Sequence, residues 1–155
     1  MVEKSKKRIA FITIVSIFLG LTLLFIYMNS LKEPSSSAEQ SGGFYALFGD
    51  ILSVFGKNFK NSVLNIITPH KFRKLAHIVE YTLVAIEFNL LYLAIFGKKP
   101  LNALYSLGAG VFIAVSDELL QLTVGRNGNF QDVLLDLIPV AIISLLFLLS
   151  FIKTK

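Results

Sequence analysis

The chain has 155 residues, of which 54% are hydrophobic and 16% are charged, a balance far from that of an ordinary soluble domain and typical of a one-domain integral membrane protein. Its formal net charge of +5 does not indicate a nucleic-acid partner, because the basic residues gather beside apolar runs and so follow membrane topology. The sequence contains no cysteine, which excludes a disulfide framework, a thiolate nucleophile and a zinc–thiolate site.

The first predicted element is a membrane-spanning helix from Ile9 to Met28. This stretch carries no charge and, at about 20 residues, is long enough to cross a hydrocarbon core of roughly 30 Å. The basic residues before it, and a small-residue stretch at Ser36-Ser37-Ala38, leave a cleaved signal peptide as the alternative. The apolar region of a signal peptide is typically about 7–15 residues long, so residues 1–28 are interpreted as a cytoplasmic basic tail and an uncleaved first transmembrane helix.

The stretch 29–70 is predicted to be an extracytoplasmic linker followed by an amphipathic segment. Serine and glycine are frequent in residues 29–43, which is typical of a flexible linker. From Phe44 to Thr68 apolar residues recur at steps of about three or four and polar residues fill the other side, which predicts an amphipathic helix. This helix either lies in the membrane interface or packs on the protein's own bundle, and Gly49 and Gly56 could break it in two.

Residues 71–155 are predicted to form a core with three further transmembrane helices. They run from Leu75 to Phe96, from Leu101 to Val124 and from Asp132 to Ile152, with a short basic turn and a glycine-containing turn between them. The sequence thus predicts an all-α, integral membrane bundle of four transmembrane helices, with an amphipathic interfacial helix between the first and the second.

Two features of the core predict how its helices pack. The small residues Gly108, Ala109 and Gly110 in the third span permit close contact with a neighbouring helix. Pro139 should kink the fourth span near its first turns, a break that membrane helices tolerate when neighbouring groups satisfy the backbone.

Four spans place both termini on one side of the membrane. The basic residues 4–8 and 98–99 share that side with Lys153 and Lys155, and the positive-inside rule makes it cytoplasmic. The predicted location is therefore the cell membrane, with a multi-pass topology, both termini cytoplasmic and membrane lipids as neighbours.

A first polar cluster opens the second span on the opposite, outer side. It contains Arg73, Lys74, His77, Glu80 and Tyr81, and three of these, Arg73, His77 and Glu80, fall on one helical face. Arg73 and Lys74 flank the span against the positive-inside bias, so topology does not explain them. Ionisable groups inside a span are costly and usually face a protein interior or a water-filled cavity.

A second polar cluster, with Asp117, Glu118 and Gln121, closes the third span. Glu80 and Glu118 each lie about six residues inside the outer end of their span, which is about 9 Å at 1.5 Å per residue. The two clusters are therefore expected at matching depth. The residues that three helices are predicted to bring to one outer-leaflet cavity are Arg73, His77, Glu80, Tyr81, Asp117, Glu118, Gln121, Arg126, Asp132 and Asp136.

A structural role is the alternative for these groups. The arginines and the carboxylates could pair with one another and hold the bundle together, as polar groups inside membranes often do. Glu87 stands apart in mid-span, without an obvious partner in the sequence, and is assigned no role.

The polar clusters and the turn that follows them resemble the VanZ-like family of membrane proteins. In chain order, the motifs that carry the resemblance are Arg73-Lys-x-Ala-His77-x-x-Glu80-Tyr81, Asp117-Glu118-x-x-Gln121, Gly125-Arg126 and Asp132-Val133. The resemblance covers roughly residues 70–150 and leaves the amphipathic segment outside. It implies a small bacterial multi-pass membrane protein of the type linked to resistance against glycopeptides such as teicoplanin. The family usually follows the Asp-Val pair with an asparagine and glycine-rich positions, where this chain has Asp136 and Ile138-Pro139.

The first functional hypothesis is an outer-leaflet site for an anionic lipid-linked envelope precursor. Its basic residues would neutralise phosphate, with arginine suited to bidentate contacts, and its carboxylates and glutamine would hydrogen-bond a sugar or peptide portion. Binding on this face could lower the effect of a glycopeptide that targets such precursors. The predicted ligand-binding residues are Arg73, Lys74, Tyr81, Gln121, Arg126 and Asp132.

The alternative is an intramembrane hydrolase or transferase acting on lipid-linked phosphate substrates. His77 would serve as general base, and Asp117 or Glu118 would orient it or bind a divalent metal. Glu80 completes the predicted catalytic set in that case. The sequence carries no compact metal signature such as H-E-x-x-H, so it specifies neither a metal nor another cofactor. A small transporter fits less well, because the polar cluster is confined to one leaflet.

Overall fold

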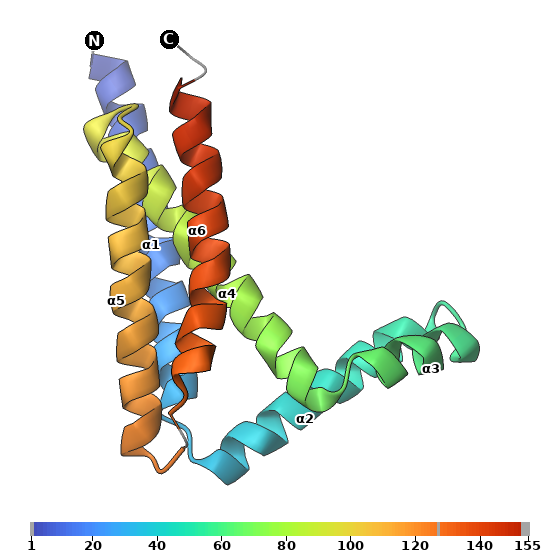
Figure 1. Ribbon diagram of the computed structural model, residues 1–155. Helices are drawn as coiled ribbons and strands as arrows, with labels where there is room; N and C mark the ends of the chain where they lie inside the picture. The colour runs from blue at the N-terminus through green and yellow to red at the C-terminus, as the bar shows by residue number, and fades with distance from the viewer. Residues whose placement is uncertain (1, 127, 153–155) are drawn as a thin grey trace.

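The computed structural model describes residues 2–126 and 128–152, and the described chain is built from helices (Figure 1). In chain order these helices are α1 (Val2–Ser30), α2 (Pro34–Ser53), α3 (Lys57–Ile66), α4 (Pro69–Phe96), α5 (Leu101–Thr123) and α6 (Phe130–Ile152). No strand occurs within these described ranges, so the predicted all-α class is confirmed.

The helices α1, α4, α5 and α6 are each long and apolar enough to cross a membrane. Their outer faces expose large apolar side chains, among them Ile17 on α1, Phe112 on α5 and Leu145 on α6. Such faces would be unfavourable in water but suit contact with lipid tails. The prediction of a membrane protein with four spanning helices is confirmed.

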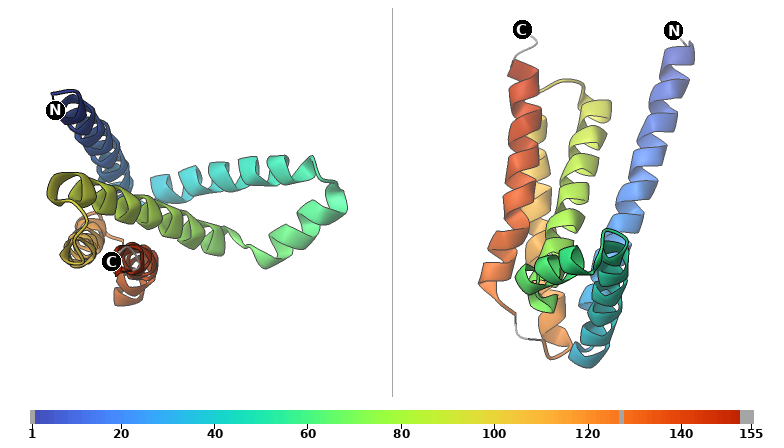
Figure 2. Two further views of the ribbon diagram at one scale, coloured as in Figure 1. Left: turned by 90° about the horizontal axis from the view of Figure 1, so that it is seen from above. Right: turned by 90° about the vertical axis from the view of Figure 1, so that its right-hand side faces the viewer.

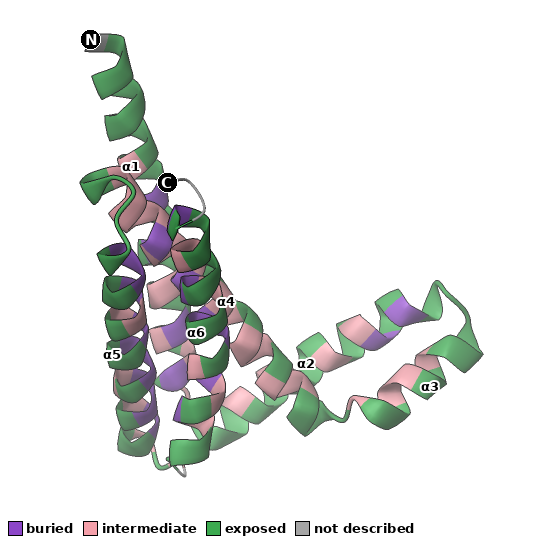
Figure 3. Cartoon of the chain, turned by 45° about the horizontal axis from the view of Figure 1, so that its top comes forward, coloured by how far each residue is buried: buried purple, intermediate pink, exposed green. Residues whose placement is uncertain are grey.

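The bundle is organised around α4, which packs against α1, α5 and α6 (Figure 2). Buried residues lie on the sides of the helices that face one another, and exposed residues lie on the outer sides (Figure 3). The helices α5 and α6 approach closely at Gly110, where an added Cβ would lie 2.5 Å from Cγ1 of Val140. The predicted close contact through small residues is therefore made at Gly110, whereas Gly108 has open space beside it. Pro139 is accommodated within α6, which continues as one helix.

Both ends of the described chain lie at one end of the bundle, together with the turn between α4 and α5 (Figure 1). Arg8 donates from Nε to the carbonyl oxygen of Ala94 and from Nη2 to that of Ile95, at 2.7 Å each. A cation there satisfies the last carbonyls of α4 and opposes the negative end of its dipole. Lys153 and Lys155, which the topology prediction also uses, lie outside the described residues. Which side of the membrane this end faces stays a prediction.

The segment between α1 and α4 projects sideways at the other end of the bundle (Figures 1 and 2). The flexible linker predicted for residues 29–43 is wrong from Pro34 onward, because α2 begins there. Proline suits the first position of a helix, because the backbone N–H that it lacks would have no hydrogen-bond acceptor within the helix there. The predicted amphipathic helix exists as the second half of α2 and as α3, broken at Gly56, whose φ of 105° favours glycine.

Helix α4 begins earlier than the predicted span. Its first residue is Pro69, and the side chain of Thr68 caps it by accepting a hydrogen bond from the backbone N–H of Lys71 at 3.4 Å. Because the helix starts here, the whole first polar cluster lies on one continuous helix that runs directly into the apolar span. Its side chains therefore keep the helical spacing that the sequence predicts for them.

Candidate functional site

A polar cavity of about 280 Å³ lies at the end of the bundle opposite the termini, between α4, α6 and the ends of α2 and α5. The start of α4 supplies one wall and the first turns of α6 supply another. Predicted site residues that line it are Arg73, Lys74, His77, Glu118, Gln121, Arg126 and Asp132, together with Asp136. Residues of both predicted clusters thus line one cavity, although Glu80, whose depth matches that of Glu118 in the sequence, is not among them.

Three predicted site residues do not line this cavity. Tyr81 and Asp117 are fully buried behind it, with exposed fractions of 0% and 1%. Glu80 faces a neighbouring, mainly apolar cavity. Tyr81 is thus not placed to touch a ligand in the polar cavity directly.

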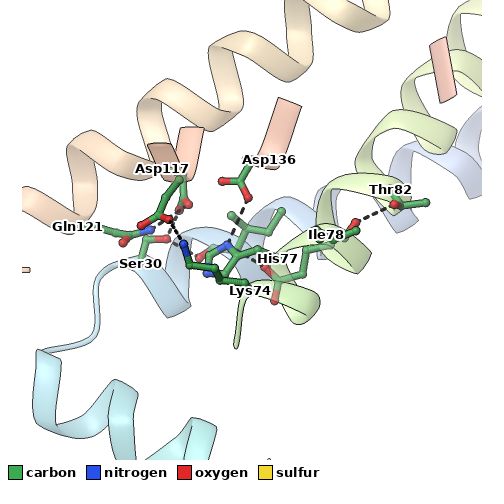
Figure 4. A network of polar contacts seen from close by, with 11 residues as sticks. Ser30, Lys74, His77, Ile78, Thr82, Asp117, Gln121 and Asp136 are labelled. Carbon is green, nitrogen blue, oxygen red and sulfur yellow. Dashed lines mark hydrogen bonds and ion pairs between the residues drawn. The ribbon is translucent and has the colours of Figure 1, made fainter. Parts of the chain in front are cut away.

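Asp117 is held by donors from two helices (Figure 4). It accepts a hydrogen bond from the hydroxyl of Ser30 at the end of α1, and another from Nε2 of Gln121 at 3.0 Å on its own helix. Ser30 is itself buried, and its hydroxyl oxygen also lies 2.9 Å from the carbonyl oxygen of Ile26, a second acceptor for the same proton. Sequence reasoning missed Ser30, because a single serine at the end of an apolar run carries no distinguishing signal.

His77 faces two carboxylates without bonding to either. Its Nδ1 lies 3.8 Å from Oδ1 of Asp136 and 3.9 Å from Oε2 of Glu80 (Figure 4). This nitrogen is buried and has no hydrogen-bond partner among the described residues. His77, Asp117 and Asp136 each offer a ligand atom, and these atoms lie within 4.8 Å of one another. They are the residues that could hold a metal here.

The rim of the cavity is closed by contacts between neighbouring elements. Lys74 Nζ lies 3.1 Å from Oδ1 of Asp132, and both side chains are more than a third exposed. An exposed pair of this kind contributes little to stability, so either partner can turn to a ligand. Glu118 accepts a hydrogen bond from the backbone N–H of Asn129, which fixes the turn between α5 and α6. Glu118 therefore both holds this turn and lines the cavity.

The two arginines of the site form no ion pair with another described residue. In the described part of the chain, neither Arg73 nor Arg126 lies within 4.0 Å of a carboxylate oxygen. Arg126 donates from Nη1 to the carbonyl oxygen of Asn29 at 3.5 Å. Burial, and next the positive charge of Arg73, lower the pKa of Arg126, although an arginine side chain stays charged at neutral pH. Two such charges in one wall favour an anion.

An apolar groove adjoins the polar cavity between α1, α2 and α4. Its inner part has a volume of about 360 Å³ and shares Arg73, His77 and Arg126 with the polar cavity. Apolar side chains such as Phe25 and Phe48 line it, and the same two residues line an outer part of about 680 Å³ along α1 and α4. The arginines thus stand where the polar cavity meets the apolar groove. The sequence did not predict this groove, since it did not predict the first half of α2.

Glu87 lies outside these cavities, as its separation in the sequence indicates. Its Oε1 accepts a hydrogen bond from Oγ1 of Thr22 at 3.0 Å, which joins α1 to α4 in mid-span. This contact gives Glu87 a structural partner that the sequence alone did not reveal.

Comparisons with known proteins agree with the resemblance seen in the motifs. A model of the family described as VanZ/LLP1 matches residues 11–152. No curated protein and no solved structure matches the chain. The family match is wider than the stretch 70–150 that the motifs cover, because it includes most of α1 and the α2–α3 segment. Since it covers nearly the whole chain, the protein belongs to the VanZ/LLP1 family.

Proposed function

We propose that this protein binds an anionic lipid-linked precursor of the cell envelope, with the headgroup in the polar cavity and the lipid tail in the apolar groove. The observation that carries the proposal is that Arg73 and Arg126 line both spaces. In a lipid-linked precursor the phosphate also stands between a polar headgroup and an apolar tail. Arginine suits this position, because its planar guanidinium donates two parallel hydrogen bonds to phosphate oxygens.

The charge distribution supports an anionic ligand. Arg73 and Arg126 have no carboxylate within ion-pair distance among the described residues, and Lys74 is held only by an exposed contact with Asp132. A bound phosphate would neutralise the arginines and could also attract Lys74. The energetic gain is larger here than at an open surface, because the partly buried wall screens charge less than water does.

The remaining polar groups of the cavity suit a headgroup with hydroxyl or amide groups. Gln121, Glu118 and Asp132 line the cavity from two helices. Carboxylates accept hydrogen bonds and an amide both donates and accepts, so this set matches sugar or peptide groups. A simple phospholipid headgroup would leave some of these three side chains without a hydrogen-bond partner.

Family membership supports a VanZ-like protein linked to glycopeptide resistance. The predicted topology would place the polar cavity in the outer leaflet of the cell membrane. Glycopeptides such as teicoplanin act on envelope precursors from that side. A protein that holds such precursors in the outer leaflet would reduce what the antibiotic can reach.

The proposal is tested by titrating purified protein with a polyprenyl diphosphate and with the matching neutral polyprenol, and by measuring occupancy with native mass spectrometry. We expect tight binding of the diphosphate and a loss of affinity of at least tenfold in Arg126→Ala and in Arg73→Ala. Lys98→Ala, which removes a basic residue at the other end of the bundle, should bind like the wild type. Unchanged binding in both site variants would end the proposal.

A second candidate function rests on the surroundings of His77. An imidazole nitrogen 3.8 Å from a buried carboxylate, beside the proposed phosphate position, suits a general base in an intramembrane hydrolase or transferase. Such an enzyme would act on the same lipid-linked phosphates. Release of phosphate from the polyprenyl diphosphate, lost in His77→Ala, would favour this function, and the absence of turnover in the wild type would exclude hydrolysis.

A further inference from the structure

We infer that His77, Asp117 and Asp136 form a binding site for one divalent cation of the manganese or magnesium class. The three residues come from α4, α5 and α6, and their ligand atoms lie within 4.8 Å of one another. An ion bound there would join the three helices that form the centre of the bundle. This inference concerns the ion alone and does not depend on which lipid the protein binds.

The distances around His77 fit a shared ion better than a direct contact. Its Nδ1 lies 3.8 Å from a carboxylate oxygen of Asp136 and 3.9 Å from one of Glu80, too far for a hydrogen bond. A cation bonded to nitrogen and oxygen at about 2.0–2.2 Å holds neighbouring ligand atoms about 3–4 Å apart. An ion between these groups would give the buried and unpartnered Nδ1 a partner.

Tyr81 is an independent sign that a polar group belongs here. It lies one helical turn after His77 on the same face of α4. Its side chain is 0% exposed, and its hydroxyl has no hydrogen-bond partner among the described residues. A water molecule on the ion would give the hydroxyl the partner that it lacks.

The burial of the two aspartates also calls for a nearby positive charge. Asp117 and Asp136 are 1% and 3% exposed, and burying two negative charges is very unfavourable unless they are paired. Lys74 is engaged by Asp132 at the rim, and among the described residues neither Arg73 nor Arg126 lies within 4.0 Å of a carboxylate oxygen of the two aspartates. The hydrogen bonds from Ser30 and Gln121 orient the Asp117 carboxylate, as the surroundings of a metal ligand commonly do.

The ligand types select the class of ion. Carboxylate oxygens with one imidazole suit Mn²⁺ or Mg²⁺, whereas the chain has no cysteine that would favour a softer metal. His77 and Asp136 also line the polar cavity, so the open coordination positions of the ion would face it. An ion in this place could bind an anionic oxygen of a ligand directly.

The test is a titration of the purified, chelator-treated full chain with Mn²⁺, without added lipid, followed by electron paramagnetic resonance. We expect one saturable site per chain and a loss of affinity of at least tenfold in Asp117→Asn and in Asp136→Asn. Glu87→Gln removes a carboxylate from α4 away from the cluster and should bind Mn²⁺ like the wild type. Circular dichroism and gel filtration verify that each variant is folded.

A second measurement identifies the nitrogen ligand without relying on the aspartate variants. The echo modulation of bound Mn²⁺ should show coupling to a ¹⁴N nucleus in the wild type and in His70→Gln, but not in His77→Gln. These are the two histidines of the chain. The inference is overturned if the wild type binds no saturable Mn²⁺, if folded aspartate variants keep its affinity, or if the nitrogen coupling is missing or survives in His77→Gln.

Discussion

His77 on α4 and Asp136 on α6 face each other across the polar cavity, with 3.8 Å between Nδ1 and a carboxylate oxygen. Position 136 is where the chain departs from the usual pattern of the family that it resembles. Asp136 lines the polar cavity beside the histidine, so this departure adds a carboxylate to the cavity wall. Any ligand that enters the polar cavity meets this pair.

We predict that the form of the cation at position 126 matters as well as its charge. Arg126→Lys keeps the charge but cannot donate two parallel hydrogen bonds to one phosphate group. The free energy of binding the polyprenyl diphosphate should weaken by about 1.5–3 kcal/mol, the size of one charged hydrogen bond. Isothermal titration measures the change, with Lys98→Arg as the matched control. Wild-type affinity in Arg126→Lys would mean that the residue acts only as a point charge.

The apolar groove gives a prediction about the lipid tail. Ala76 lines both parts of the groove without lining the polar cavity, so Ala76→Trp should fill the space for the tail. Binding of a long-chain polyprenyl diphosphate should weaken strongly, whereas binding of a short-chain analogue with the same headgroup should change little. Leu104→Trp, at an exposed position on α5, controls for the added bulk. Equal losses for both chain lengths would contradict the assignment of the groove to the tail.

The contact of Gly110 with Val140 predicts a packing defect. In Gly110→Ala the new Cβ would stand 2.5 Å from Cγ1 of Val140, so α5 and α6 must move apart. Overpacking of this kind costs about 1–3 kcal/mol of the free energy of unfolding. Thermal unfolding in detergent should show the loss, and Val140→Ala in the same chain should restore part of it. A Cβ added at Gly108 would have no neighbour within 4 Å, so Gly108→Ala should not lower stability.

Ser30 links the first helix to the site, which predicts an effect of Ser30→Ala on both stability and binding. The substitution removes the hydroxyl that Asp117 accepts from, and leaves a buried carboxylate with one donor fewer. We expect a loss of about 1–3 kcal/mol in unfolding free energy. Thr13→Ala is the control, because that hydroxyl bonds only to the carbonyl of Ile9 in its own helix. An equal effect of the two substitutions would argue against the link.

The sequence predicts the spanning helices well, because long apolar runs between charged turns leave few alternatives. It also predicts a polar cavity, because ionisable residues inside spans face the protein interior or a water-filled space, and those of separate spans can share that space. The depth of each residue follows from the helical rise and the ends of the spans alone. Glu118 lines the polar cavity at the predicted depth, whereas Glu80 faces the adjoining apolar groove.

What the sequence does not predict depends on contacts between distant segments. Helix α2 extends back to Pro34 through serines and glycines whose local preference is weak, and it is held by tertiary contacts. Tyr45 donates its hydroxyl to the carbonyl oxygen of Ile67 at 2.9 Å, and the rings of Phe48 and Phe72 lie 5.2 Å apart. These contacts hold the second half of α2 beside the start of α4, and this arrangement of distant segments, which forms one side of the apolar groove, could not be foreseen from composition alone.

The most direct measurement is mass spectrometry of the lipids that copurify with the protein from its native membrane. Wild type and Lys98→Ala should both carry an anionic lipid-linked precursor, enriched over its abundance in the membrane. Arg126→Ala, purified to the same folded state, should carry only bulk phospholipids. The same lipid profile in all three proteins would contradict a precursor site at the junction of the polar cavity and the apolar groove.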